Sequence, residues 1–162
     1  MEPELRLRTA VHESGHAVVA VLIGRAVNYV SVEPTLGSLG RTVLSHGHVL
    51  DLDDHRQVER EIALLVAGCV SEVIGAVATL PSGCTEEIWQ AALLAVQIGN
   101  GRRGFERVVG RTARMLKAVW PAVLVLANEL QRRQRLDGRA VRRLVQRELR
   151  LRRRWSLMRR CQ

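Results

Sequence analysis

The chain has 162 residues, of which 47% are apolar and only 3% are aromatic. This length and composition predict one globular domain with an aliphatic core, which favours helices. The sequence contains no internal repeat. The formal charge of +9 comes almost entirely from arginine, since Lys117 is the only lysine. Genome composition explains such a bias as readily as an anionic partner does.

The cysteines Cys69, Cys84 and Cys161 form no C-x-x-C motif or other paired pattern. We therefore expect no disulfide framework and a reducing, cytoplasmic environment. The acidic N-terminus does not resemble a signal peptide. The most apolar run, residues 62–80, nearly reaches membrane-spanning length, but small residues and Glu72 interrupt it, so we interpret it as a buried helix.

A first helix of about twenty residues is predicted between Pro3 and Gly24, and it carries the H-E-x-x-H motif His12-Glu13-Ser14-Gly15-His16. Histidines four residues apart on a helix project from one face, so both can bind one metal ion. The glutamate between them can take a proton from a metal-bound water. The alternative is a histidine pair without a metal, but the apolar run that follows makes unpaired buried histidines costly. The motif therefore predicts a zinc site.

Two short strands are predicted at residues 27–34 and 41–45, where apolar residues alternate and turn residues follow. They would form a small antiparallel sheet beside the metal helix. In zinc peptidases generally, an edge strand at this place can bind an extended substrate through main-chain hydrogen bonds.

The next segment carries His46 and His48, with acidic residues nearby. With these acidic residues, an H-x-H pattern can form a second metal site. It is more often a polar loop that leads to a helix N-cap, here at Asp53 or Asp54. Both interpretations stay open on the sequence alone.

A long helix is predicted at about residues 55–77, with Glu72 inside its apolar surface. Glu72 would be a metal ligand, an acceptor that orients a ligand histidine, or a partly exposed structural residue. The following helix begins near Thr85 with Glu86 and Glu87 in its first turn, where the helix dipole favours negative charge. Helical spacing places Glu86 on a polar face and Glu87 on an apolar one, so Glu87 is the better candidate for a third metal ligand.

A helical segment is then predicted from residue 105 to 135 with a break at Pro121, and a last helix from residue 139. We divide the chain into a domain at residues 1–149 and a basic C-terminal tail at residues 150–162, which carries six arginines. The tail could contact nucleic acid or an anionic membrane. A solvated helix end is the commoner explanation.

Three blocks resemble the peptidase domain of the FtsH family of membrane-anchored, ATP-dependent zinc proteases. Residues 8–17, R-T-A-V-H-E-S-G-H-A, resemble the family's R-T-A-Y-H-E-A-G-H-A. Residues 67–74, A-G-C-V-S-E-V-I, resemble its G-G-R-A-A-E-E-I, and residues 82–88, S-G-C-T-E-E-I, stand in the place of its T-G-A-S-N-D-I. The resemblance covers roughly residues 6–145, and it implies a mainly α metallopeptidase domain with a small β-sheet.

By this resemblance, His12 and His16 are zinc ligands and Glu13 is the catalytic base. The family's third-ligand aspartate falls on Glu87, whose extra methylene requires a shift of its helix. Glu72 matches an acidic position near the site. The resemblance therefore implies a zinc-dependent endopeptidase that acts on peptides or unfolded chains.

The chain departs from the family in having no Walker-type loop, ATPase module or membrane helix before the peptidase part. We therefore expect ATP-independent activity, unless a separate ATPase delivers substrates. The family's hexameric ring also depends on the ATPase part, so the resemblance admits an oligomer without fixing its state. The alternative is a catalytically inactive, metal-binding regulatory or interaction module that retains the peptidase fold.

Overall fold

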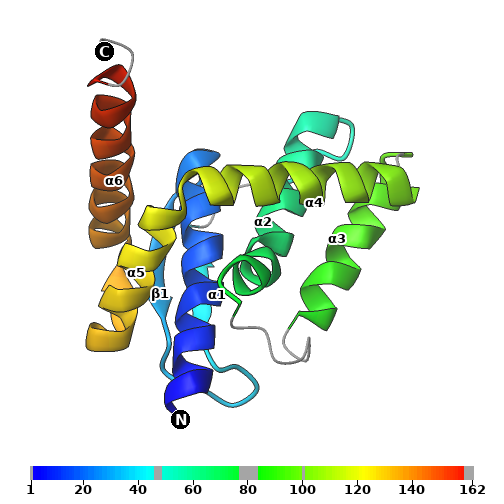
Figure 1. The fold of residues 1–162 in the computed structure, drawn as a ribbon. Coiled ribbons are helices and arrows are strands. Elements are labelled where there is room, and N and C mark those ends of the chain that lie inside the picture. Colours follow the sequence, from blue (N-terminus) through cyan, green and yellow to red (C-terminus); the bar gives the residue numbers. More distant parts are fainter. Residues whose placement is uncertain (1, 46–48, 77–83, 100, 159–162) are drawn as a thin grey trace.

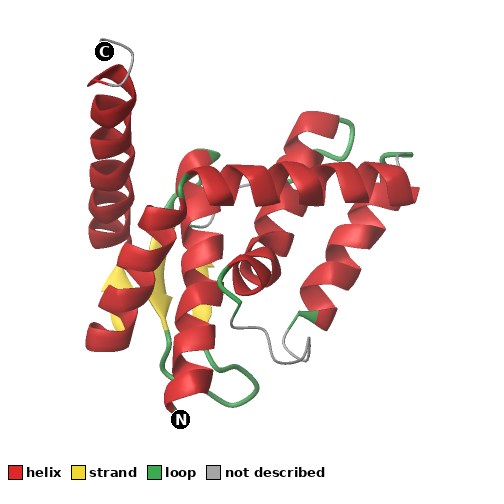
Figure 2. Cartoon of the chain, viewed as in Figure 1, coloured by secondary structure: helices red, strands yellow, loops and turns green. Residues whose placement is uncertain are grey.

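The computed structural model describes residues 2–45, 49–76, 84–99 and 101–158. This part of the chain is mainly helical, with one small antiparallel sheet, which confirms the predicted class (Figures 1 and 2). The elements are α1 (Pro3–Leu22), β1 (Val27–Ser31), β2 (Arg41–Leu44), α2 (His55–Ile74), α3 (Thr85–Gln97), α4 (Gly101–Ala118), α5 (Trp120–Arg133), β3 (Arg135–Asp137) and α6 (Gly138–Met158).

Helix α1 is the central element of the fold, with α2 on one side and α5 and the sheet on the other (Figure 1). Pro3 occupies its first turn, where a missing N–H costs nothing. Its middle, residues 9–20, is almost entirely buried, with Ala10, Ala17 and Val18 fully inaccessible. The helix therefore carries the H-E-x-x-H motif through the core, as its flanking apolar run predicts.

Helix α2 begins after Asp54, whose carboxylate accepts hydrogen bonds from the backbone N–H groups of Arg56 and Gln57 at 3.0 and 3.1 Å. Asp54 is one of the two N-caps that the sequence predicts, so this prediction is confirmed. The helix ends at Ile74, and Ala76 follows with a positive φ of 52°. His46 and His48 lie outside the described residues, as does the end of the apolar run beyond residue 76.

The sheet has the order β2-β1-β3, with both pairings antiparallel. Val30 of β1 lies opposite Thr42 of β2 and Leu136 of β3. The sequence predicts β1 and β2 but places only a boundary where β3 lies, because three residues are too short for a period of two to be recognised. β2 is left with one edge that no described strand covers.

Helices α4 and α5 meet at Val119, which confirms the predicted break before Pro121. Helix α4 begins at Gly101, four residues before the start that the sequence predicts at residue 105. Gly104 is the first member of a buried stripe along α4. The stripe continues every four residues with Val108, Thr112 and Leu116.

A disulfide joins Cys69 of α2 to Cys84, which directly precedes α3. The expectation of no disulfide was therefore wrong. The two cysteines are 15 residues apart and have no diagnostic spacing, but the packing of α3 against α2 brings their Cα atoms to 5.7 Å. Only this tertiary contact reveals the pair.

None of the helices in the described ranges has the combination of length and apolar character that crossing a bilayer requires. The apolar run beginning at Ile62 instead forms the buried half of α2. Helix α6 continues through residue 149 as far as Met158, across the boundary that the sequence suggests for a basic tail.

Gly138 offers a test of how closely α6 packs on β1, because α6 begins at this residue directly against that strand. A Cβ atom there would overlap the Val27 carbonyl oxygen and lie 2.7 Å from its carbon. Gly138→Ala should therefore lower the free energy of unfolding by about 3 kcal/mol, measured by urea denaturation.

Gly110→Ala is the matched control for Gly138→Ala. It lies within α4, and the nearest atom that its Cβ would meet is Arg114 Nη1 at 3.6 Å. This variant should gain about 0.5–1 kcal/mol, because alanine favours a helix over glycine. Equal stability of the two variants would contradict the close approach of α6 to β1.

Candidate metal centre

The centre begins where α1 and α2 cross, because two glycines let these helices approach closely. A Cβ atom on Gly15 would collide with Ser71 and lie 2.6 Å from the carbonyl oxygen of Ala67. A Cβ atom on Gly68 would occupy the space of the His12 and His16 rings. The imidazoles therefore lie directly over Gly68, and their Nε2 atoms are 3.0 Å apart.

Helix α3 brings Glu87 to the same point. Its Oε1 atom lies 3.1 Å from His16 Nε2 and 3.4 Å from His12 Nε2. Its neighbour Glu86 is exposed and instead accepts a hydrogen bond from Gln90 at 2.8 Å. The side chains of Glu86 and Glu87 thus point in different directions, as the sequence predicts, and Glu87 is the one that lies near the histidines.

These three atoms lie close to the spacing that a zinc ion requires. Zinc binds nitrogen and oxygen at about 2.0–2.2 Å, so tetrahedral ligands lie about 3.3–3.5 Å from one another. The distances within the triangle are 3.0, 3.1 and 3.4 Å. Two imidazoles and a carboxylate are also the donor set of many catalytic zinc sites, so the residues present fit the metal.

On the far side of each imidazole, a hydrogen bond at Nδ1 holds the ring so that its Nε2 atom points toward the proposed metal position. His16 Nδ1 lies 2.8 Å from the Leu64 carbonyl oxygen, and His12 Nδ1 lies 2.8 Å from Glu72 Oε1. Each Nδ1 can thus donate its proton outward and leave the Nε2 lone pair inward. Arg8 Nε in turn donates to Glu72 Oε2 at 2.6 Å. Of the three interpretations of Glu72, this geometry supports the acceptor that orients a histidine.

Three carboxylates surround the histidine pair, and they change its protonation. Burial opposes the charged form of His12, but hydrogen bonds to Glu72 and Glu87 outweigh it and raise the pKa of His12 to about 10. Burial also opposes ionisation of Glu87, but hydrogen bonds to His12 and His16 lower its pKa to about 2. Without a metal, protonated His12 and Arg8 therefore balance the Glu72 and Glu87 carboxylates, and a bound divalent cation would take the place of the His12 proton.

Glu13 differs from the other two carboxylates because burial dominates its titration. Its side chain is in the core of the crossing, and burial raises the pKa of this carboxyl above its usual range. The Thr42 hydroxyl, from β2, lies 2.8 Å from Glu13 Oε2 and 3.0 Å from its carbonyl oxygen. A carboxyl of raised pKa and fixed orientation is suited to accept and return a proton.

The site opens into two clefts that meet at Glu13 and Glu87. One has a volume of about 510 Å³ and runs between the first turns of α1 and the loop at residues 35–40. The other, of about 360 Å³, lies along β2 and is lined there by Arg41, Thr42 and Leu44. A ligand that entered from either side would reach the histidines and Glu13.

Sequence reasoning missed the residues that act on the centre from outside the motif. Arg8 lies within the block that resembles the family, but only the structure reveals its contact with Glu72. Thr42 and the Leu64 carbonyl carry no sequence signal, because their contacts depend on how β2 and α2 pack on α1.

No family model matches the chain. Over 148 residues the chain is 34% identical to the ATP-dependent zinc metalloprotease FtsH 3 of Conexibacter woesei, a match that covers 90% of this chain and 20% of that protein. Over 132 residues it is 30% identical to the ATP-dependent zinc metalloprotease FtsH 1 of Sorangium cellulosum, covering 80% of this chain and 21% of that protein.

The chain thus spans about a fifth of the length of these curated relatives. It is a distant homologue of FtsH zinc metalloproteases over most of its own length. Both names contain zinc, a metal that the described group of His12, His16 and Glu87 could hold.

The contact between Glu72 and His12 can be tested by metal affinity. Glu72→Gln removes the charge that faces His12 Nδ1 and Arg8, so the histidine is held less firmly and becomes a weaker ligand. Zinc affinity, measured by competition with a chromogenic chelator, should fall about 10- to 100-fold.

Glu59→Gln is the matched control on the same helix. Glu59 accepts from Arg107 and Arg111 at 3.0 and 2.9 Å, near the other end of α2. Its zinc affinity should equal that of the parent chain. An unchanged affinity in the Glu72 variant would show that Glu72 does not support the centre.

Proposed function

We propose that this chain is a zinc-dependent endopeptidase domain of the FtsH type, which hydrolyses peptide bonds in peptides or unfolded chains. The observation that carries the proposal is the triangle of His12, His16 and Glu87 donor atoms at 3.0–3.4 Å, with Glu13 beside it. The distant homology to FtsH zinc metalloproteases supports the same assignment.

In this proposal, His12, His16 and Glu87 hold the zinc, and Glu13 is the catalytic base. When bound, zinc would supply a Lewis acid that acidifies water and polarises the scissile carbonyl. Glu13 takes the proton that the water loses and returns it to the departing amine. Because burial raises the pKa of Glu13, the carboxyl can retain this proton between the two transfers.

The position of β2 supports an extended peptide as substrate. No described strand pairs with one edge of β2, and the cleft along it is also lined by Glu13, His16 and Glu87. A peptide that adds to this edge by main-chain hydrogen bonds would carry its carbonyl groups past Glu13. Such pairing needs an extended chain, which peptides and unfolded proteins provide without ATP. A separate ATPase would be needed only to deliver folded substrates.

The role of Glu13 is tested by Glu13→Gln, which keeps the size and polarity of the side chain but removes its basicity. Zinc content should stay equal to that of the parent chain, because Glu13 is not one of the proposed ligands. Cleavage of an unfolded chain such as casein should fall by about 10³-fold.

Glu86→Gln, at an exposed position of α3, should leave both zinc content and cleavage unchanged. Retained cleavage by Glu13→Gln would remove Glu13 from the mechanism. If the zinc-loaded parent chain cuts no unfolded protein or peptide of a diverse panel, the endopeptidase is refuted. The inactive metal-binding module that retains the fold then becomes the better description.

The hydroxyl of Thr42 offers a second test, because it contacts Glu13 but no proposed zinc ligand. Thr42→Val removes a hydrogen bond to a carboxylate while keeping the shape of the side chain. The kcat should fall about tenfold with little change in KM. Thr42→Ser, which keeps the hydroxyl, should restore most of the rate, and equal rates for both variants would contradict the orienting role.

A further inference from the structure

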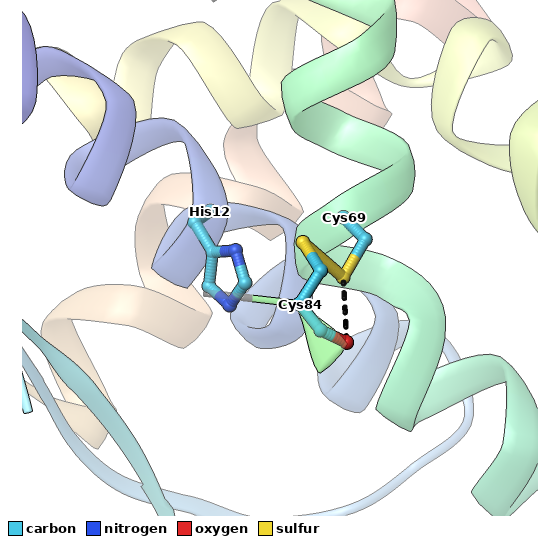
Figure 3. Close-up of side chains that lie close together, drawn as sticks. All are labelled: His12, Cys69 and Cys84. Carbon is cyan, nitrogen blue, oxygen red and sulfur yellow. Dashed lines mark hydrogen bonds between the residues drawn. A yellow bond between two sulfur atoms is a disulfide. The ribbon is translucent and has the colours of Figure 1, made fainter. Parts of the chain in front are cut away.

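The Cys69–Cys84 disulfide lies against the metal centre (Figure 3). Both sulfurs and one ring nitrogen of His12 lie within 4.8 Å of one another, a spacing at which they could bind one ion. His12 also belongs to the set formed with His16 and Glu87. The centre therefore has two potential ligand sets that share one histidine.

Each sulfur lies near one of the carboxylates that contact His12. Cys69 Sγ is 3.5 Å from Glu87 Oε2, and Cys84 Sγ is 4.0 Å from Glu72 Oε1. Cys69 and Cys84 are themselves only 8% and 4% exposed. The disulfide is therefore buried among the carboxylates that contact the histidines. Its position places any change in the sulfur chemistry directly beside the proposed zinc ligands.

Reduction would convert the disulfide into two additional donors. A dithiol supplies two electrons and two protons, the S–S bond breaks, and the dithiol becomes a disulfide while Cys69 and Cys84 become thiols. On binding zinc, each thiol releases its proton and becomes a thiolate. Thiolates are softer ligands than carboxylates, and zinc binds them strongly.

We propose that Cys69 and Cys84 form a redox-controlled alternative pair of zinc ligands. In the disulfide state, zinc is held by His12, His16 and Glu87 and keeps an open position. In the dithiol state, the two thiolates bind the zinc together with His12 and displace Glu87. The first ligand set rests on the proposed function, whereas the second rests on the sulfur positions alone.

Cobalt(II) can report on this exchange without any substrate, because thiolate ligands give it an intense charge-transfer band in the near ultraviolet. The full chain would carry Cys161→Ser, which removes the remaining thiol. Its disulfide form should bind cobalt without this band. A phosphine then reduces the disulfide: it takes the oxygen of a water molecule, and the two sulfurs receive the two protons. The reduced chain should develop the band, and it should bind zinc at least about tenfold more tightly than the disulfide form does.

Two variants separate the ligand sets. Glu87→Gln should bind zinc weakly in the disulfide state and recover its affinity on reduction, with the thiolate band present. Cys69→Ser combined with Cys84→Ser should lack the band and show no gain in affinity under the same reductant. Thermal unfolding of both variants checks that the fold is kept.

The proposal is overturned if the reduced parent chain shows no thiolate band, or if Glu87→Gln does not regain zinc on reduction. These readouts do not depend on proteolysis. Tight zinc binding by Glu87→Gln in the disulfide state would instead count against the ligand set of the proposed peptidase. In that case the thiolate band would still decide whether the cysteines bind the metal. The two proposals can therefore fail separately.

Discussion

The close crossing of α1 and α2 is the constraint on which the rest of the structure depends. Gly15 and Gly68 have no Cβ atom, and a Cβ at either position would meet the opposite helix or the histidine rings. Because the helices approach this closely, α2 can supply both the Glu72 carboxylate and the Leu64 carbonyl to the histidines of α1. The direction of each imidazole thus follows from backbone packing rather than from the motif itself.

Charge within this crossing links the centre to stability. Buried carboxylates cost free energy unless a cation or a hydrogen bond compensates them. Glu72 has Arg8 and His12 as partners, while Glu87 depends on the histidines alone among its described ion pairs. Without metal, a proton on His12 balances part of this charge, as the high pKa of His12 indicates. A metal ion replaces this proton, so metal binding and folding should be coupled in this chain.

The sequence predicts features that depend on local spacing and misses those that depend on tertiary packing. Helix α1, its histidine pair and the Asp54 cap follow from residues a few positions apart. The inward direction of Glu87 follows from helical periodicity. The Thr42 contact with Glu13 and the cysteine pair join segments that are 29 and 15 residues apart, so no local period reveals them. The first turn of α4, with its buried Gly104, lies outside the helix that the sequence predicts from residue 105, because a glycine gives no helical signal without its packing partners.

Three departures from the family pattern, at Cys69, Cys84 and Glu87, meet at one place in the fold. The bond between the cysteines ties α2 to the residue just before α3, and Glu87 lies in the first turn of α3. The longer glutamate side chain still places Oε1 within 3.4 Å of both histidines, while Oε2 lies 3.5 Å from Cys69 Sγ. The position of the carboxylate therefore depends on where the disulfide fixes the start of α3. Glu87 and the cysteine pair therefore depend on each other. A change at either would alter the distances between the Glu87 carboxylate, the histidines and the sulfurs.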